Sequence, residues 1–151
     1  MCGIAGFLDP GSNRSPESMR RHVRDMTNCL AHRGPDDEGA WVDPTAGVAL
    51  GNRRLAIIDL SPEGHQPMHF ASGRYVITYN GEIYNSVAIA RTLDSAGLAP
   101  RWRGHSDTEV ILAAIEAWAS TGRSSRSTAC SRSRSGMSAS EHCAWCAIDL
   151  A

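Results

Sequence analysis

The second residue of the chain, Cys2, has a nucleophilic side chain, and its place near the N-terminus could provide an α-amino group as the base. A small second residue permits removal of Met1, after which Cys2 becomes the N-terminal residue. Its thiol then lies beside a free α-amino group with a pKa of about 8, which can accept a proton without a separate histidine. A thiolate attacks amide carbonyls readily. Position alone is more typical of a small buried cysteine, so the case for chemistry depends on partner residues elsewhere.

A candidate partner group is Asn80-Gly81-Glu82, at the predicted end of a strand. The Asn80 side-chain amide and the Gly81 backbone N–H could converge on one oxygen, as an oxyanion hole requires. Glycine also lets the backbone approach a ligand closely. An isolated Asn-Gly dipeptide is equally typical of a plain hairpin turn, which remains the alternative for this segment.

Arg54 and Asp107 are complementary anchors for the two ends of an α-amino acid. A guanidinium group binds a carboxylate through two parallel hydrogen bonds, and a carboxylate binds an ammonium group. The alternative is a surface arginine and an aspartate that the helix dipole favours at a helix start. No metal site is predicted, because three histidines lie in predicted loops without metal-ligand spacing: His32, His65 and His105.

Composition limits the classes of protein that can carry these residues. The chain has 151 residues, which corresponds to one domain or part of one, and its 42% hydrophobic content excludes disorder of the whole chain. A formal net charge of −1 argues against a general nucleic-acid binder. The apolar runs are too short to cross a membrane. The N-terminus has no basic segment typical of a secretory signal, so we expect a cytoplasmic protein without structural disulfides.

The strands and helices that must position the candidates follow from periodicity and turn signals. Strands are predicted at residues 2–8, 40–42, 48–60 and 74–79, with a loop at 61–67. One helix starts at Ser15-Pro16, a second covers 86–96 and ends at Gly97, and a third follows the capping box Ser106-Asp107-Thr108-Glu109. The predicted apolar stripes of the first and third helices are Met19, Val23, Met26 and Leu30, and Ile111, Ala114, Ile115 and Trp118. Hairpin-length links between these elements predict the α+β class.

The composition changes near residue 119. Residues 119–140 are rich in serine and arginine, without apolar periodicity of either kind, so a tail at 119–151 is predicted to be disordered. Lysine is absent from the whole chain, which suggests a GC-rich coding sequence. A shifted reading frame near Trp118 would then produce the same tail. The pattern Cys143-Ala144-Trp145-Cys146 is interpreted as accidental, since no partner pair supports a zinc or redox site.

Six segments, in their order along the chain, resemble one family. They are Met1-Cys2-Gly3-Ile4-Ala5-Gly6, His32-Arg33-Gly34-Pro35-Asp36, Arg54-Leu55-Ala56-Ile57-Ile58-Asp59-Leu60, Gly64-His65-Gln66-Pro67-Met68, Asn80-Gly81-Glu82-Ile83-Tyr84-Asn85 and Ser106-Asp107-Thr108-Glu109-Val110. Residues 1–118 thus resemble the glutaminase domain of glutamine-hydrolysing asparagine synthetases. That domain is a class II glutamine amidotransferase with the N-terminal-nucleophile hydrolase fold.

The resemblance implies a role for each matching residue. Cys2 would attack the side-chain amide of glutamine, its α-amino group would relay the proton, and Asn80 with the Gly81 N–H would stabilise the oxyanion. A glutamyl thioester and ammonia would form, and water would then release glutamate. Arg54 would bind the substrate α-carboxylate, and Glu82 and Asp107 would bind its α-ammonium group. The backbone of four residues would line the pocket: Leu55, Ala56, Ile57 and Ile58.

The resemblance also implies a four-layer sandwich, with two antiparallel sheets between helices. Here it would be incomplete at its C-terminal end, because Gly136-Met137 is followed by polar residues where the family continues with apolar ones. The glutaminase domain needs no cofactor. ATP and Mg would belong to a synthetase domain, absent or separate, that accepts the ammonia. The alternative is a catalytically inactive, truncated remnant of such an enzyme, and a nucleic-acid or redox role for the tail ranks last.

Overall fold

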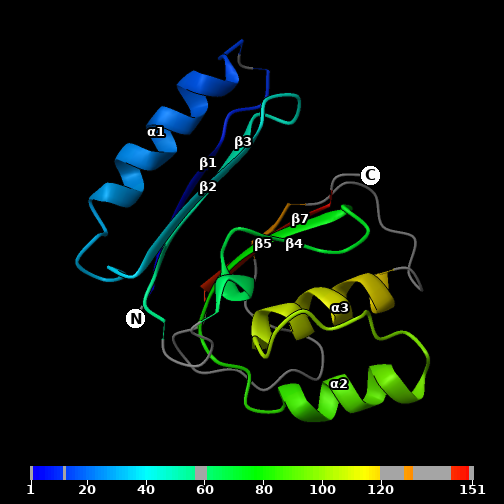
Figure 1. Ribbon diagram of the computed structural model, residues 1–151. Helices are drawn as coiled ribbons and strands as arrows, with labels where there is room; N and C mark the ends of the chain where they lie inside the picture. The colour runs from blue at the N-terminus through cyan, green and yellow to red at the C-terminus, as the bar shows by residue number, and fades with distance from the viewer. Residues whose placement is uncertain (1, 12, 57–60, 120–127, 131–143, 150–151) are drawn as a thin grey trace. The chain divides into compact units, whose positions relative to one another are not determined.

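The computed structural model describes residues 2–11, 13–56, 61–119, 128–130 and 144–149. The chain divides into two compact units, one of Met1–Ile57 with His65–Pro67 and the other of Ile58–Gly64 with Met68–Ala151. Each unit combines an antiparallel sheet with helical structure, one α-helix in the first unit and two in the second (Figure 1). The predicted α+β class is thereby confirmed, while the four-layer stacking stays a prediction.

The first unit is a three-stranded sheet covered on one face by a helix. Strands β1 (Gly3–Leu8), β2 (Asp37–Asp43) and β3 (Val48–Arg54) pair in the order β1-β3-β2. Helix α1 (Pro16–Asn28) runs along this sheet (Figure 1). The antiparallel register places Gly3 opposite Arg53, so Cys2 lies at the end of the sheet where β3 finishes.

Helix α1 begins where the sequence predicts and packs through a slightly different stripe. The Ser15 side chain accepts a hydrogen bond from the Ser18 N–H, as an N-cap should. Met19 and Val23 are buried as predicted, but Met26 is 40% exposed and Thr27 is buried in its place. The reason is helical geometry, because residue 27 lies one turn after residue 23 on the same face. That face meets Gly51 of β3, where a side chain would collide with Val23 and Thr27.

Strands β2 and β3 differ in length from the strands predicted from the sequence. β2 extends over Asp37–Asp43 rather than only 40–42. β3 was predicted to continue to residue 60, but it ends at Arg54. The backbone groups of the next two residues, Leu55 and Ala56, bond to side chains instead of to a neighbouring strand. Residues 57–60 lie outside the described part of the chain.

The second unit has a four-stranded antiparallel sheet with two helices beside it. The strand order is β4 (Met68–His69), β5 (Tyr75–Asn80), β7 (Ala144–Asp149) and β6 (Thr128–Cys130). Helix α3 (Asp107–Ala119) packs against β5, and α2 (Ser86–Ser95) packs against α3 (Figure 1). A short 3-10 turn, η1 (Pro62–Gly64), occupies the predicted loop at 61–67. The core of this unit includes Ile77, Leu93 and Leu112, each fully buried.

Two of these strands, β6 and β7, fall within residues 119–151, for which the sequence predicted no element. β7 pairs with β5 from Tyr75↔Asp149 to Asn80↔Ala144, so this range contributes two strands to the sheet. Cys143, one of the two cysteines dismissed as accidental, lies outside the described residues. The domain boundary at residue 118 stays a prediction.

Helix α2 ends where the sequence predicts, whereas the buried face of α3 is wider than predicted. α2 ends in a Schellman motif, in which Gly97 has φ +68° and the Leu98 N–H bonds to the Leu93 carbonyl at 2.9 Å. The predicted stripe of α3 is too narrow, because Leu112 and Ala113 are buried as well, whereas Trp118 is 39% exposed. The helix is covered both by β5 and by α2, so more than one stripe is buried. Across the described residues, no helix is long and apolar enough to cross a membrane.

Candidate active site

The Cys2 thiol is held by the backbone just beyond β3. The Leu55 N–H donates a hydrogen bond to Cys2 Sγ at 3.4 Å, and Sγ lies 3.7 Å from the Leu55 carbonyl oxygen, to which the thiol donates. The Cys2 side chain is half-buried. The two contacts hold the Cys2 sulfur beside the Leu55 backbone, at the end of the first sheet.

Asp36 binds the backbone of residues 54–56 on the side opposite to Cys2. The Asp36 N–H donates to the Arg54 carbonyl at 3.1 Å, and Asp36 Oδ2 accepts from the Ala56 N–H at 2.8 Å. Gly34 is buried against the same backbone, and an added Cβ there would collide with the peptide between Arg53 and Arg54. The sequence assigned no role to Gly34 or Asp36. The sequence does offer a signal for both residues, namely a glycine and a hydrogen-bond acceptor side chain just before a predicted strand.

In the second unit, Asn80 is the last residue of β5 and Gly81 and Glu82 follow it directly. Asn80 is half-buried, whereas Gly81 and Glu82 are exposed. An amide side chain at a strand end, followed by an exposed glycine N–H, is a donor pair of the kind that stabilises an oxyanion. The next residue, Ile83, is buried and anchors the turn in the core of this unit.

Asp107 is the first residue of α3, and its carboxylate faces the same turn. Its Oδ2 atom accepts a hydrogen bond from the Ile83 N–H at 2.9 Å. Burial raises the pKa of Asp107 above its usual value, and the nearby charge of Glu82 raises it further, while hydrogen bonds from Ile83 and Thr108 oppose the shift. A cation placed beside two carboxylates that repel each other stabilises the charged form of both. This pair can therefore bind an ammonium group.

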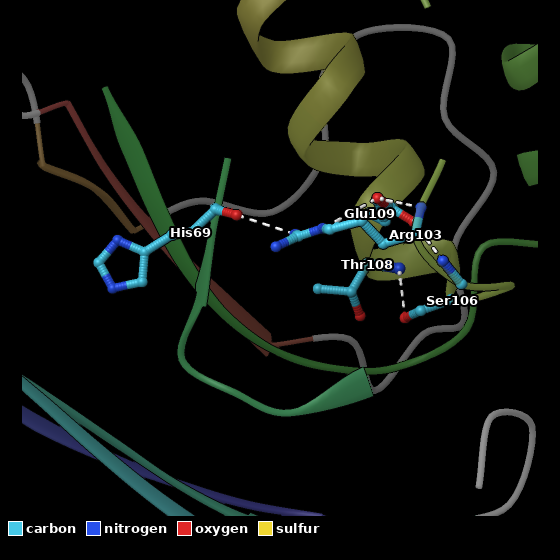
Figure 2. Close-up of polar contacts among 6 residues, drawn as sticks. His69, Arg103, Ser106, Thr108 and Glu109 are labelled. Carbon is cyan, nitrogen blue, oxygen red and sulfur yellow. Dashed lines mark hydrogen bonds and ion pairs between the residues drawn. The ribbon is translucent and has the colours of Figure 1, made fainter. Parts of the chain in front are cut away.

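The start of α3 is fixed by Glu109, although not by the predicted capping box. Ser106 Oγ accepts from the Thr108 N–H at 3.2 Å, which is a standard N-cap. The buried Glu109 carboxylate does not complete the box; it accepts hydrogen bonds from the Arg103 and Gly104 N–H groups at 3.0 to 3.2 Å. The Arg103 guanidinium also pairs with Glu109 and donates to the His69 carbonyl at 3.0 Å (Figure 2). Glu109 thus ties the loop before α3, and through Arg103 also β4, to the helix.

The structure brings the predicted residues together in two groups. The first unit holds Cys2 beside Leu55, with Arg54 and Ala56 on either side of Leu55 along the chain. The second unit holds Glu82 near Asp107, and Asn80 and Gly81 lie directly before Glu82. Ile57 and Ile58 lie outside the described residues. Among those that are described, no group of three or more histidine, cysteine or acidic side chains could hold a metal ion.

Comparison with known proteins gives one consistent result. The family described as "Glutamine amidotransferase domain" matches residues 1–127. "Amidase chry2" of Gibberella zeae is 38% identical over 75% of this chain and 17% of that protein. Two asparagine synthetases [glutamine-hydrolyzing] of Bacillus subtilis, numbers 1 and 3, are 35% and 37% identical over 75% and 78% of this chain.

This chain spans less than a fifth of those relatives' lengths, with 17% of the first two and 18% of the third covered. The similarity therefore concerns one domain of larger proteins. The match to the family nevertheless covers most of the present sequence and begins at its first residue, so it includes both groups of candidate site residues. The chain belongs to the glutamine amidotransferase domain family, and its similarity extends to the corresponding part of glutamine-hydrolysing asparagine synthetases.

Proposed function

We propose that this chain hydrolyses glutamine to glutamate and ammonia through a thioester on Cys2. The observation that carries the proposal is the Leu55 N–H at 3.4 Å from Cys2 Sγ, a contact that holds the sulfur at the end of the first sheet. After removal of Met1, the α-amino group of Cys2 accepts the thiol proton while sulfur attacks the glutamine side-chain amide. The same group then gives the proton to the leaving nitrogen, which departs as ammonia.

Charge that develops on the attacked carbonyl oxygen needs hydrogen-bond donors that are in place before the reaction. In this proposal Asn80 and the Gly81 N–H supply them, and water later attacks the thioester to release glutamate. Their position at a strand end supports the role, because the end of β5 is anchored by the pairing of Asn80 with Ala144. Donors carried by a fixed element do not have to reorganise during the reaction.

Recognition of the amino acid part of glutamine is assigned to charged groups from both candidate groups. Arg54 binds the α-carboxylate, and the backbone of residues 55–58 lines the pocket. Glu82 and Asp107 bind the α-ammonium group. Burial, and to a lesser extent the charge of Glu82, raises the pKa of Asp107, and this supports the pairing, since a bound cation would offset both effects.

The domain that we propose is a four-layer sandwich of the N-terminal-nucleophile type, acting without a metal or cofactor of its own. Its ammonia would be used by an ATP-dependent and Mg-dependent synthetase domain. The relatives support the assignment, since the named asparagine synthetases are much longer than the part that matches this chain. We also propose that the protein acts in the cytoplasm.

The test is glutamate formation by the full chain and by two cysteine variants. The wild type should release glutamate and ammonia from glutamine, and Cys2→Ala should release neither. Cys29→Ala is the matched control, because Cys29 is an exposed cysteine of the same unit without a proposed role. It should keep the wild-type rate. Activity retained by Cys2→Ala would overturn the proposal. A wild type that melts cooperatively but releases no glutamate would identify an inactive remnant.

A further inference from the structure

We infer that Asp36 is a positioning residue for the Cys2 thiol, acting through the backbone of residues 54–56. The inference deepens the proposed function, since it rests on Cys2 as the nucleophile. It concerns a side chain to which neither the sequence motifs nor the proposed reaction assigns a role. Four hydrogen bonds and one tight backbone contact carry it, all within the first unit.

The backbone of residues 54–56 bonds alternately to opposite sides. In an extended chain, the N–H and C=O of one residue point one way and those of the next residue point the other way. Here the Arg54 carbonyl and the Ala56 N–H both bond to Asp36, at 3.1 and 2.8 Å. The N–H and carbonyl of Leu55 both face Cys2 Sγ, at 3.4 and 3.7 Å. Fixing residues 54 and 56 on one side therefore aims Leu55 at the thiol on the other.

The Asp36 carboxylate takes the place of a strand at this point. Pairing between β2 and β3 ends at Asp37↔Arg54. Pro35 comes just before Asp36, and a proline cannot donate to a ladder, so the β2 backbone does not continue the pairing. The side chain of Asp36 reaches instead to the Ala56 N–H, two residues past the last pair. A residue without an acceptor side chain at position 36 would leave the Ala56 N–H to bond with water. Residues 55–56 would then be held only by the bonds between Leu55 and Cys2.

Gly34 shows that this arrangement is a close fit rather than a loose contact. It is buried, and a Cβ at this position would meet the carbonyl of Arg53 and the nitrogen of Arg54. Residues 34–36 and 53–56 therefore pack backbone against backbone. The hydrogen bond that the Asp36 carboxylate accepts acts on a segment whose position is already limited by this contact, so its loss should reorient Leu55 rather than unfold the unit.

The experiment measures the alkylation rate of Cys2 by iodoacetamide in the full chain, with Cys29 as the internal reference thiol. This readout does not require glutamine hydrolysis, so it can fail or succeed independently of the proposed function. The variants are Asp36→Ala, which removes the acceptor, and Asp36→Asn, which keeps an acceptor oxygen but removes the charge. The control is Asp43→Ala, because the Asp43 carboxylate likewise accepts from backbone N–H groups of the same unit, those of Thr45 and Ala46.

Asp36→Ala should remove the Leu55 N–H from the Cys2 sulfur, so it should slow labelling of Cys2 relative to Cys29 by about three- to tenfold. Asp36→Asn should restore the ratio to within about twofold, and Asp43→Ala should leave it unchanged. Faster Cys2 labelling in Asp36→Asn would instead assign the effect to charge and overturn the inference. Faster labelling of both cysteines in Asp36→Ala would show loss of the fold, and an unchanged ratio would show no role; both results overturn it as well.

Discussion

Asp107 Oδ2 accepts a hydrogen bond from the Ile83 N–H at 2.9 Å, across 24 residues of sequence. Ile83 directly follows Glu82 and is buried, so the bond fixes the turn after β5 against the first turn of α3. The candidate oxyanion donors and both candidate ammonium ligands therefore belong to one hydrogen-bonded part of the second unit. A change at Asp107 should affect both binding and the stability of this unit.

Asp107→Asn should stabilise the protein at neutral pH. Burial, and then the charge of Glu82, raises the pKa of Asp107 in the folded state. The folded protein therefore holds this proton at a pH where the unfolded chain, with a pKa of about 3.9, has released it. Stability falls as pH rises from the unfolded value through the raised folded value. Asparagine cannot ionise, yet its Oδ1 can still accept from the Ile83 N–H.

Thermal unfolding of the wild type and Asp107→Asn between about pH 3 and pH 8 checks this prediction. The melting temperature of the variant should exceed that of the wild type at neutral pH, and the difference should shrink as the pH falls. Glu82→Gln should give a smaller gain in the same direction, because it removes only the weaker of the two effects that raise the pKa of Asp107. A difference that is equal at both ends of the range would contradict the assignment to ionisation.

Glu109→Ala should destabilise the second unit much more than Arg103→Ala does. Glu109 is 5% exposed and accepts the N–H groups of Arg103 and Gly104, which its truncation would leave without their acceptor. The free energy of unfolding should fall by about 2–3 kcal/mol, in the upper part of the range for leaving partly buried donors without an acceptor. The Arg103 side chain is 48% exposed, so removing it should cost about 1 kcal/mol or less. Urea unfolding of both variants measures the difference, and equal losses would contradict it.

The candidate residues of the second unit's turn could be chosen from the sequence, but the contacts that hold this turn could not. Asn80, Gly81 and Asp107 could be chosen by residue type, because donors and carboxylates at element ends are local features. The partners of Glu109 could not, since its spacing from Ser106 fits a capping box equally well. The loop before α3 offers two backbone N–H groups instead, and only tertiary structure decides between these acceptor positions.

The same limit applies to the strand that was predicted to run to residue 60. The apolar and β-branched composition of residues 48–60 favours a strand over the whole range. Composition, however, does not show where the neighbouring strands end. In the structure β2 begins at Asp37 and β1 begins at Gly3, so β3 has paired neighbours only up to Arg54. Strand length here depends on the partners, which the sequence of the strand itself does not reveal.

Gly34→Ala should slow Cys2 alkylation and lower stability together. The new Cβ would meet the Arg53 carbonyl and the Arg54 nitrogen, which are backbone atoms and cannot rotate away. Crowding of this kind costs about 1–3 kcal/mol and should displace the residues that precede Leu55. Differential scanning calorimetry and the labelling ratio of Cys2 to Cys29 measure the two effects. A loss of stability with an unchanged labelling ratio would show that Cys2 does not sense this contact.

Asn80→Ala should slow glutamine hydrolysis by about 10²–10³-fold, mainly through kcat, because an oxyanion donor acts on the transition state rather than on bound substrate. KM should change much less, since the charged ends of glutamine are assigned to Arg54, Glu82 and Asp107. Asn85→Ala is the control, as Asn85 lies five residues later at the start of α2 and has no assigned role. It should stay within a few-fold of the wild type. If steady-state kinetics show that Asn80→Ala raises KM while kcat stays the same, Asn80 binds the substrate rather than the oxyanion, and the proposed mechanism needs another donor.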